Sequence, residues 1–403
     1  MSTQMRIALV SAFPPGVQSL NEYGFHLAKA LVANPEVSEV VVIADRLCAP
    51  ADELDLGPKL RVERVWDFNS LTSGPAIIRA LKKADVDGAV WNLQTASFGD
   101  REIPAALGLC APALARLAGV PSGIIAHNII AGIDLENTQM KGQRFRQAIV
   151  RAGGAVITRA MMQADYVTVT LRGYADQLTA SYPRASVHLV GHGTFDTETR
   201  EVSRLGTRAK RIVTMGKFGT YKRLETLLSA FDLLRKDPEF SDYELVIGGT
   251  DHPNTPGYVK SVAALRKDDA GVRFHGYVAE DDVPTFFGDA RASVFDYSTT
   301  TGSSGVLHQT ASYGAVPVFP NIGDFVDVSR DEGLNGANYG VGDAADMARA
   351  MGSVLGNDEA AQTLADANRK ASMDMPISEV AAFHVALLRS RLKRRRSGSQ
   401  AIA

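Results

Sequence analysis

The stretch RIVTMGKFGTYKRLETLLSAF, from Arg211 to Phe231, decides the fold class of this chain. It opens with the apolar run of a buried strand. A helical spacing of apolar residues follows at Leu224, Leu227, Leu228, Phe231 and Leu234. Between the two lies a turn with Lys217 and Lys222, at the place where parallel α/β sheets bind ligands. The stretch therefore predicts a strand–turn–helix unit of a parallel sheet.

Strand and helix patterns alternate on both sides of this stretch. Strand patterns precede it in RIALVSAF, EVVVIAD, GAVWNL, SGIIAHN and YVTVTL, and follow it in YELVIGG, VRFHGYV, ASVFDYS and AVPVFP. Strands separated by helices favour βαβ units with parallel strands. Because the series restarts at Arg211, two successive halves explain it better than one sheet. The predicted fold class is α/β, with two successive Rossmann-like domains.

The domain boundary is expected in GHGTFDTETREVSRLGTRAKR, residues 191–211, which is polar and has no clear period. The predicted domains are residues 1–195 and 196–374. An amphipathic helix at 375–392 is expected to cross back to the first domain. The basic segment 393–403 is expected to be a disordered tail, with solvation favoured over a contact with anionic lipid.

Length and composition limit the class of protein. The chain has 403 residues, of which 45% are apolar and 22% charged, and a formal net charge of -2. These values are ordinary for a protein with a sizeable core, and the charge provides no field that attracts nucleic acid. Cys48 and Cys110 lie far apart and form no metal-ligand pattern, which favours a reducing compartment.

The first residues, MSTQMRIALVSAF, enter a strand pattern without the features of a secretion signal. No apolar run approaches the ~18–20 residues of a membrane span. The expected location is the cytoplasm, with binding to the inner face of the membrane left open. The first helix is expected to begin with a capping box formed by Ser19 and Glu22.

A second stretch, TTTGSSGVLHQTASYGAVPVF from Thr299 to Phe319, opens with hydroxyls and glycines and then becomes apolar with helical spacing. Gly302, Gly305 and Gln309 share one face of this helix. A helix start exposes free N–H groups and a positive dipole end, and glycines let a ligand approach closely. The stretch predicts an anion site, although a plain capped helix ending at Gly314 has the same pattern.

The order of these motifs resembles family 4 of the retaining glycosyltransferases, which implies two Rossmann-like domains facing across a cleft, the GT-B fold. The similar segments are, in order, MRIALVSAFPP, AHN, ADYVTVTLRGYADQL, GHGTFD, GKFGTYKRLETLLSAF, VRFHGYVAEDDVPTFFGDARASVFDYS, GSSGVLHQTASYGAVPV and NGANYGVGDAADMARAM. Together they extend over nearly the whole chain. The resemblance implies transfer of a sugar from a UDP- or GDP-type donor to a hydroxyl acceptor, with retention of anomeric configuration.

The resemblance also implies a donor site in the second half. The family holds the donor diphosphate with an Arg and a Lys, at the positions of Lys217 and Lys222. Its two glutamates, which contact the sugar and the ribose, correspond to Thr301 and Gln309. The nucleotide base packs against the turn HGYV, which contains Tyr277. The donor-binding residues implied are Gly216, Tyr277, Val278, Asp296, Thr301, Gly302, Ser303, Ser304, Gly305 and Gln309.

Three departures from the family pattern bear on activity. Lys217 keeps the charge of the family's Arg but loses its bidentate fork. Gln309 keeps an acceptor oxygen, so ribose binding survives with a weaker hydrogen bond. Thr301 removes a carboxylate beside the sugar. Asp296, at the end of a strand, either replaces that carboxylate in part or is an ordinary strand-end residue.

In the first half, the resemblance assigns His127 to a position near the donor sugar. The family's paired glycines in an acceptor-binding loop are missing here, where Gln18 and Ser19 stand at about their positions with Gly16 close by. The implied catalytic residues are His127, Lys217 and Lys222. Because these lysines and the N–H groups of the helix start stabilise the leaving diphosphate, no metal and no other cofactor is expected.

The implied acceptor is a glycan or lipid-linked intermediate in polysaccharide assembly. Lys141, Arg144 and Arg151 lie on one face of an expected helix, which is either a solvated face or a contact with anionic membrane. Gly153 and Gly154 weaken that helix prediction. Two alternatives to a transferase stay open: a catalytically silent GT-B protein that binds nucleotide or glycan, and a nucleotide-sugar epimerase on the same fold.

Overall fold

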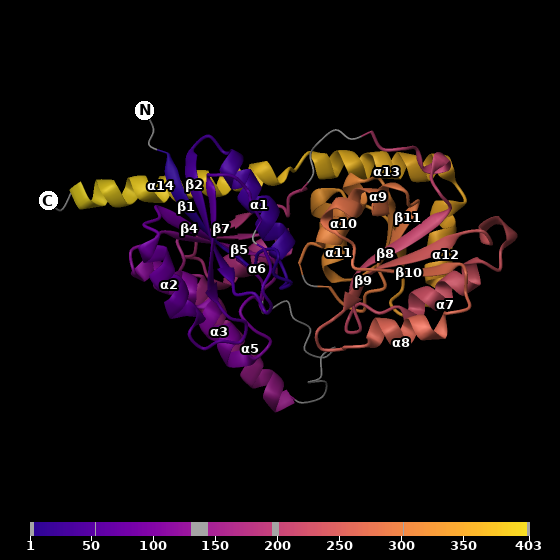
Figure 1. The fold of residues 1–403 in the computed structure, drawn as a ribbon, viewed down its shortest axis with the longest axis horizontal. Coiled ribbons are helices and arrows are strands. Elements are labelled where there is room, and N and C mark those ends of the chain that lie inside the picture. Colours follow the sequence, from indigo (N-terminus) through magenta and orange to yellow (C-terminus); the bar gives the residue numbers. More distant parts are fainter. Residues whose placement is uncertain (1–3, 53, 130–143, 196–200, 301, 401–403) are drawn as a thin grey trace. The chain divides into compact units, whose positions relative to one another are not determined.

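The computed structural model describes residues 4–52, 54–129, 144–195, 201–300 and 302–400, without the side chains of 144–150 and 395–400. The chain divides into two compact units (Figure 1). The N-terminal unit comprises Met1–Phe195 and Ile377–Ala403, and the C-terminal unit comprises Asp196–Pro376. Each unit is built on its own parallel sheet, so the predicted α/β class with two Rossmann-like domains is confirmed.

The N-terminal unit has a seven-stranded sheet in the order β3-β2-β1-β4-β5-β6-β7, with every neighbouring pair parallel. Its strands are β1 (Met5–Val10), β2 (Val37–Asp45), β3 (Leu60–Trp66), β4 (Gly88–Leu93), β5 (Ser122–Ala126), β6 (Tyr166–Val169) and β7 (Val187–Leu189). The central strands β4, β5 and β6 are buried along their whole length. Burial on both faces explains why their sequences are apolar runs rather than alternating patterns.

Helices cover both faces of this sheet (Figure 1). They are α1 (Asn21–Ala33), α2 (Ser73–Lys83), α3 (Glu102–Leu109), α4 (Ala111–Leu117), α5 (Arg144–Met161), α6 (Arg172–Ser181) and α14 (Ile377–Gln400). The apolar faces of α1 and α14 share one core with β1 and β2. In Figure 1 the helices α2, α3 and α5 lie on the other side of the strands.

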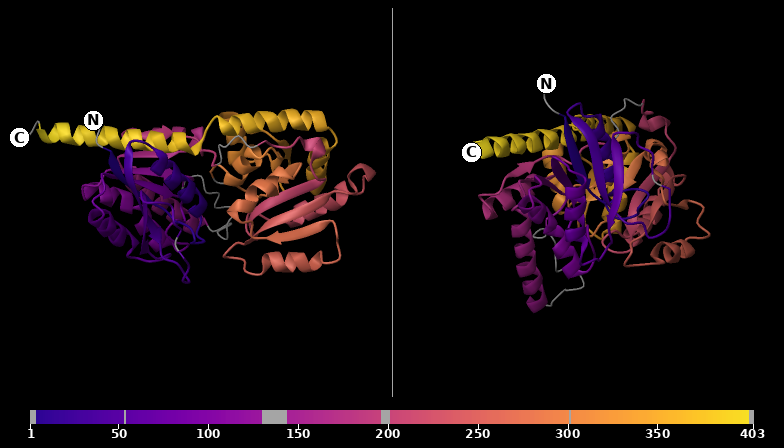
Figure 2. Two further views of the ribbon diagram at one scale, coloured as in Figure 1. Left: turned by 45° about the horizontal axis from the view of Figure 1, so that its top comes forward. Right: turned by 60° about the vertical axis from the view of Figure 1, so that its left-hand side comes forward.

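Helix α14 completes the core of the N-terminal unit, although it is the last element of the chain. It lies along that unit in both views of Figure 2, next to α1. Ala381, Val385 and Leu388 are fully buried in the shared core. The buried imidazole of His384 lies 3.0 Å from the hydroxyl of Tyr166 on β6, and burial lowers the pKa of His384 to about 3. The C-terminal helix is therefore an integral part of the first domain.

The C-terminal unit has a six-stranded sheet in the order β10-β9-β8-β11-β12-β13, again parallel throughout. Its strands are β8 (Arg211–Phe218), β9 (Glu244–Asp251), β10 (Val272–Gly276), β11 (Ala292–Val294), β12 (Val316–Pro320) and β13 (Ala337–Tyr339). Its α-helices are α7 (Glu225–Leu234), α8 (Tyr258–Leu265), α9 (Val283–Gly288), α10 (Gly305–Ser312), α11 (Gly323–Glu332), α12 (Ala344–Leu355) and α13 (Asp358–Met373). One core joins α7 and α12 to the sheet, and a second core contains α9.

Three local predictions were wrong. The capping box of Ser19 and Glu22 does not form, because α1 begins at Asn21 and has Leu20, in a left-handed conformation, as its uncapped N-cap residue. The expected helix forms as α5, but the predicted interruption at Gly153 and Gly154 does not occur: Gly154 is buried and its carbonyl accepts a hydrogen bond from Thr158. The expected disordered tail continues α14 to Gln400, since extending an existing helix requires no new nucleus.

Truncation of Leu388 tests the contribution of α14. The Leu388→Ala variant is expected to lower the free energy of unfolding of the N-terminal unit by about 2–5 kcal/mol, because it leaves a cavity between α14 and the sheet. Urea unfolding followed by circular dichroism measures this change. Leu117→Ala is the matched control in the same unit: Leu117 is 84% exposed, and its truncation is expected to change stability by less than about 0.5 kcal/mol. Equal stability of the two variants would contradict the role of α14.

Candidate functional site

The turn that follows β8 is fixed to the segment that follows β11. The N–H of Gly219 donates to the carbonyl of Lys222 at 2.8 Å, which closes the turn. Lys222 pairs with Tyr297 in an isolated antiparallel bridge, and the N–H of Ser298 donates to the carbonyl of Tyr221 at 2.8 Å. These contacts join the loop after β8 to the loop after β11, which lies about 75 residues later in the sequence. Lys222, Tyr221 and Tyr297 are therefore held together at the carboxyl ends of these two strands.

Two tyrosine rings hold the ammonium group of Lys222. Its Nζ lies 4.6 Å from the ring centroid of Tyr297 and 5.7 Å from that of Tyr221. An aromatic face attracts a cation without neutralising its charge. Within the described part of the chain, no carboxylate forms an ion pair with Lys222. A Cβ added to Gly216 would lie 3.2 Å from Cδ of Lys222, so glycine suits this place beside the lysine.

The hydroxyl of Tyr297 connects Lys222 to the start of α10. Burial raises the pKa of Tyr297, whereas the Lys222 ammonium and the Ser304 hydroxyl act in the opposite direction. Both groups therefore lie beside this hydroxyl. Tyr297 is 3% exposed, so its hydroxyl links the Lys222 ammonium to the Ser304 side chain inside the C-terminal unit.

Helix α10 begins at Gly305, with Ser304 as its N-cap residue, and the Ser304 hydroxyl accepts from the N–H of Leu307 at 3.4 Å. Among the residues that the structure describes, no partner is found for the N–H groups of Ser303, Ser304 and Gly305. These N–H groups and the positive end of the helix dipole provide an anion-binding surface. Thr301 lies outside the described residues.

Carboxylates from α11 reach this helix start, which the sequence did not reveal. The Gly302 N–H donates to the Asp324 carboxylate, and the Ser303 hydroxyl donates to Glu332 at 3.1 Å. Glu332 also pairs with the imidazole of His308 at 2.6 Å, with both side chains buried. Burial opposes the charge on His308, but the Glu332 carboxylate outweighs it and raises the pKa of His308 above 6.5. The loop is thus held by an internal ion pair.

Lys217 and Lys222 both act on the charge of His252. Burial lowers the pKa of His252, and the ammonium groups of Lys217 and Lys222 lower it further. Lys217 lies near the carboxyl end of β8, where it is in register with Thr250 of β9. Both lysines that the sequence singled out therefore lie at or just after the end of β8. Gln309 is 7% exposed, and its side chain has no hydrogen bond within the described residues.

Asp296 has a structural partner. Its carboxylate accepts a hydrogen bond from the N–H of Leu227 at 3.0 Å, in the first turn of α7. Burial raises the pKa of this carboxyl to about 6. These contacts describe a residue that caps a neighbouring helix, so a sugar contact by Asp296 rests on the resemblance alone.

The turn after β10 combines an exposed and a buried residue. Tyr277 is 66% exposed, whereas Val278 is 6% exposed and packs in the core with Val213 and Phe286. Val278 thereby fixes the turn while Tyr277 reaches the surface. The arrangement can offer an aromatic face to a planar ligand.

In the N-terminal unit, His127 follows β5 and is 7% exposed. Its Nε2 lies 2.7 Å from Oδ1 of Asn92 on β4, and burial lowers the pKa of His127 to about 3. Gly16 fits a tight turn, since a Cβ there would lie 2.8 Å from the Phe13 carbonyl. Ser19 is exposed. The close approach of the Phe13 carbonyl thus accounts for a glycine at position 16 without a bound ligand. The contact between Asn92 and His127 was not indicated by the sequence.

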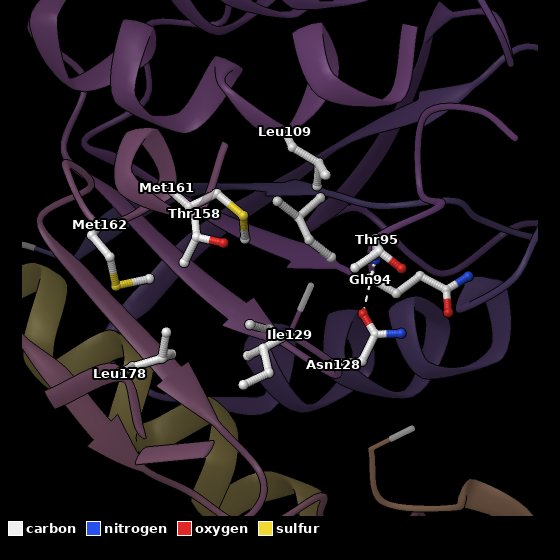
Figure 3. Close-up of a pocket in the computed structure, with 11 residues that line it drawn as sticks. Gln94, Thr95, Leu109, Asn128, Ile129, Thr158, Met161, Met162 and Leu178 are labelled. Carbon is white, nitrogen blue, oxygen red and sulfur yellow. Dashed lines mark hydrogen bonds between the residues drawn. The ribbon is translucent and has the colours of Figure 1, made fainter. Parts of the chain in front are cut away.

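A small pocket lies near the carboxyl ends of β4 and β5 (Figure 3). Leu109, Ile129, Met161 and Leu178 surround it, and at its edge the N–H of Thr95 donates to the Asn128 side chain at 2.9 Å. Its cavity volume is about 10 Å³, which is enough for about one water molecule. The pocket is therefore too small for a sugar.

Comparison with known proteins defines the class of fold. Residues 209–357, within the C-terminal unit, match a family model described as "Glycosyl transferases group 1". No curated protein sequence matches the chain significantly. Over 97% of its length the chain resembles sucrose-phosphate synthase from Thermosynechococcus elongatus, with a TM-score of 0.74, 16% identity and 100% of that chain covered.

Two further solved structures have the same architecture. The chain resembles HepE from Anabaena, in complex with UDP and glucose, over 96% of its length and 100% of that chain, with a TM-score of 0.67 and 15% identity. It resembles WaaG, a glycosyltransferase involved in lipopolysaccharide biosynthesis, over 95% of its length and 99% of that chain, with a TM-score of 0.65 and 13% identity. At these identities the likeness establishes the fold alone. The chain has the GT-B fold, and its second half is similar to group 1 glycosyltransferases.

The ion pair of His308 and Glu332 predicts a pH dependence of stability. Because the folded-state pKa of His308 is raised, its contribution is fully present below 6.5 and is lost as pH rises through the raised value. Urea unfolding of the C-terminal unit at a series of pH values measures this loss. The His308→Gln variant is expected to lack it, whereas the exposed His275→Gln is expected to keep the wild-type profile. Identical profiles for both variants would contradict the assignment.

Proposed function

We propose that the chain is a retaining glycosyltransferase, which moves a sugar from a UDP- or GDP-type donor to a hydroxyl of a glycan or lipid-linked acceptor. One observation carries the proposal: the Lys222 ammonium lies between tyrosine rings, without an ion-pair partner in the described residues, and is connected through Tyr297 to the start of α10. Two cations and a set of free N–H groups suit a diphosphate. The match of residues 209–357 to glycosyltransferases supports the same assignment.

In the proposed reaction, the bond between the anomeric carbon and the diphosphate breaks, and a bond from that carbon to the acceptor oxygen forms on the same face. The acceptor proton passes to the leaving phosphate oxygen. Negative charge grows on the diphosphate, and Lys217, Lys222 and the N–H groups of Ser303 and Ser304 stabilise it. One donor of this kind is typically worth about 10²–10³ in rate. Because these groups supply the positive charge, the proposed mechanism needs no metal.

The other site residues have proposed contacts with the donor. The exposed ring of Tyr277 suits the nucleotide base, and Gln309 suits the ribose hydroxyls. Thr301 and Asp296 are proposed near the sugar, as is His127 from the N-terminal unit. Gly16 and Ser19 are proposed to meet the acceptor. HepE provides support for the donor class, because its structure contains UDP and glucose on a similar fold.

A membrane surface is proposed as a further partner, on the basis of an exposed apolar face in the N-terminal unit. Helices α3 and α4 expose Ile103, Leu107, Leu114 and Leu117 at 66%, 46%, 45% and 84%. Neighbouring α5 exposes Arg159, and neither α4 nor α5 contains an acidic residue, whereas α3 carries the exposed Glu102 beside Ile103. In the described residues, no helix is long and apolar enough to cross a bilayer. Apolar residues beside basic ones suit the anionic inner face of a membrane in the cytoplasm.

Removal of Lys222 tests the donor site. Calorimetry with UDP and GDP is expected to show tight binding to the wild-type chain, weakened about 10- to 100-fold in Lys222→Ala, because a charge-assisted contact with phosphate is lost. Arg223→Ala is the matched control, since Arg223 is exposed and pairs with Glu225 at 3.1 Å. Unchanged affinity in Lys222→Ala would overturn the donor site.

Product analysis with UDP-sugars and lipid-linked acceptors then separates the alternatives. Transfer with retention supports the proposal. Binding without transfer or hydrolysis supports a catalytically silent protein, and release of an epimerised donor supports an epimerase.

Flotation with vesicles tests the membrane surface. The wild-type chain is expected to bind vesicles that contain anionic lipid and not neutral ones, and a double variant with Ile103→Ser and Leu117→Ser is expected to lose that binding. Leu265→Ser is the control, because Leu265 is 83% exposed but belongs to the C-terminal unit. Retained binding in the double variant would refute this surface.

A further inference from the structure

We propose that Asn92 is a positioning residue that fixes the proton of the His127 imidazole on Nε2, so that Nδ1 accepts a hydrogen bond from a substrate hydroxyl. The tautomer follows from contacts within the N-terminal unit alone. The identity of the hydroxyl, as part of the sugar or the acceptor, rests on the proposed function.

Asn92 occupies the switch point of the sheet. It is the second-last residue of β4, which lies between β1 and β5. From β1 the chain proceeds to β2 on one side, whereas β4 and β5 lie on the other, and ligands of open α/β sheets bind where the order reverses in this way. The side chain of Asn92 contacts Ser11, directly after β1, and His127, directly after β5. It thus connects three neighbouring strand ends.

The hydrogen bonds decide which way the Asn92 amide points. Its nitrogen lies 2.9 Å from Oγ of Ser11 and 3.3 Å from the carbonyl oxygen of Leu20. A carbonyl can only accept, so the atom facing Leu20 must be the NH₂ group. The Ser11 hydroxyl donates to the Ala12 carbonyl at 2.7 Å, which leaves its lone pairs for Asn92. Oδ1 of Asn92 therefore faces His127.

The amide in turn decides the tautomer of His127. Oδ1 of Asn92 can only accept, so Nε2 of His127, at 2.7 Å, must donate. Burial lowers the pKa of His127 to about 3, which leaves the ring one proton at neutral pH. Nδ1 is then a lone-pair acceptor, and no hydrogen-bond partner for it is found within the described residues. The titratable rings against His127 are Tyr23 and His192, and the Tyr23 hydroxyl donates to the His192 carbonyl instead.

The same amide restrains the first loop. Leu20 has a φ of 69°, a left-handed conformation that is uncommon for a leucine. Its carbonyl accepts from both Asn92 and the N–H of Gly24, so the turn is held from β4 and from α1. Asn92 therefore orients the start of α1 together with His127.

An accepting nitrogen selects the chemistry of its ligand. Nδ1 without a proton binds a hydroxyl, which donates, and disfavours a carboxylate or phosphate oxygen, whose lone pairs would oppose it. The group that contacts this position is therefore a hydroxyl rather than a carboxylate or phosphate oxygen.

Nitrogen-15 NMR of the histidine-labelled full chain tests the tautomer without substrate. The wild-type spectrum is expected to show a protonated Nε2 and an unprotonated Nδ1 for His127. In Asn92→Asp, the new carboxylate is expected to raise the pKa of His127 by about 1–3, because an opposite charge favours the imidazolium. Asn128→Asp is the matched control, since the Asn128 side chain accepts from the N–H of Thr95 and not from His127.

His384, buried against Tyr166, reports in the same spectra whether the fold is intact. A proton on Nδ1 of wild-type His127 would overturn the proposal, even if Asn92→Asp failed to fold. Addition of a UDP-hexose is expected to shift the Nδ1 signal more than UDP does. If the UDP-hexose binds without shifting it, the hydroxyl contact is wrong while the donor site stands. If neither these ligands nor GDP and a GDP-hexose bind, the proposed function fails and the tautomer result is still decisive.

Discussion

In a parallel sheet every strand ends at the same edge, and this directional constraint gathers the candidate residues of each unit. In the C-terminal unit, Lys222 follows β8, Tyr297 and Ser304 follow β11, and Tyr277 follows β10. In the N-terminal unit, His127 follows β5. Each of these residues is close in sequence to the end of its own strand but far in sequence from the ends of the neighbouring strands. The strand order of each sheet converts distant loops into neighbours.

Much of this arrangement could be predicted from the sequence, because buried parallel strands and amphipathic helices have clear periods. Lys217, Lys222 and the α10 start were identifiable because glycines, hydroxyls and lysines follow apolar strands. The contacts of Asp324 and Glu332 were not, because both belong to α11, and their roles depend on how that helix packs against the α10 loop. A local pattern cannot report a hydrogen bond between separate elements.

The same limit explains the partners of the other candidates. The segment ASVFDYS indicated a strand end, but the position of Tyr297 beside Lys222 depends on the pairing of two loops. The sequence placed Asn92 in the strand GAVWNL but gave no sign of a role for its side chain. The position of this side chain between Ser11 and His127 follows from the order of β1, β4 and β5 in the sheet. The start of a helix also depends on the local backbone conformation. Helix α1 begins after Leu20, which is in a left-handed conformation, and not after the expected N-cap residue Ser19.

The charges at the α10 start differ from those that the sequence suggests. Thr301 and Gln309 occupy the positions that the sequence resemblance assigns to two glutamates, so the sequence predicts a loop that is poor in carboxylates. In the structure, Asp324 and Glu332 supply two carboxylates to this loop from α11. They are engaged with Gly302, Ser303 and His308, and the His308 imidazolium balances Glu332. Lys222 is thereby left without a carboxylate among the described residues, and its charge is available to an anion.

Helix α14 belongs to the N-terminal unit although more than one complete domain precedes it in the chain. During synthesis, the seven strands of that unit leave the ribosome long before the helix that covers them. Until α14 arrives, the apolar face later covered by Val385 and Leu388 stays exposed to solvent. The domain made first is therefore the last to be finished, and this nascent surface is where a chaperone would be needed.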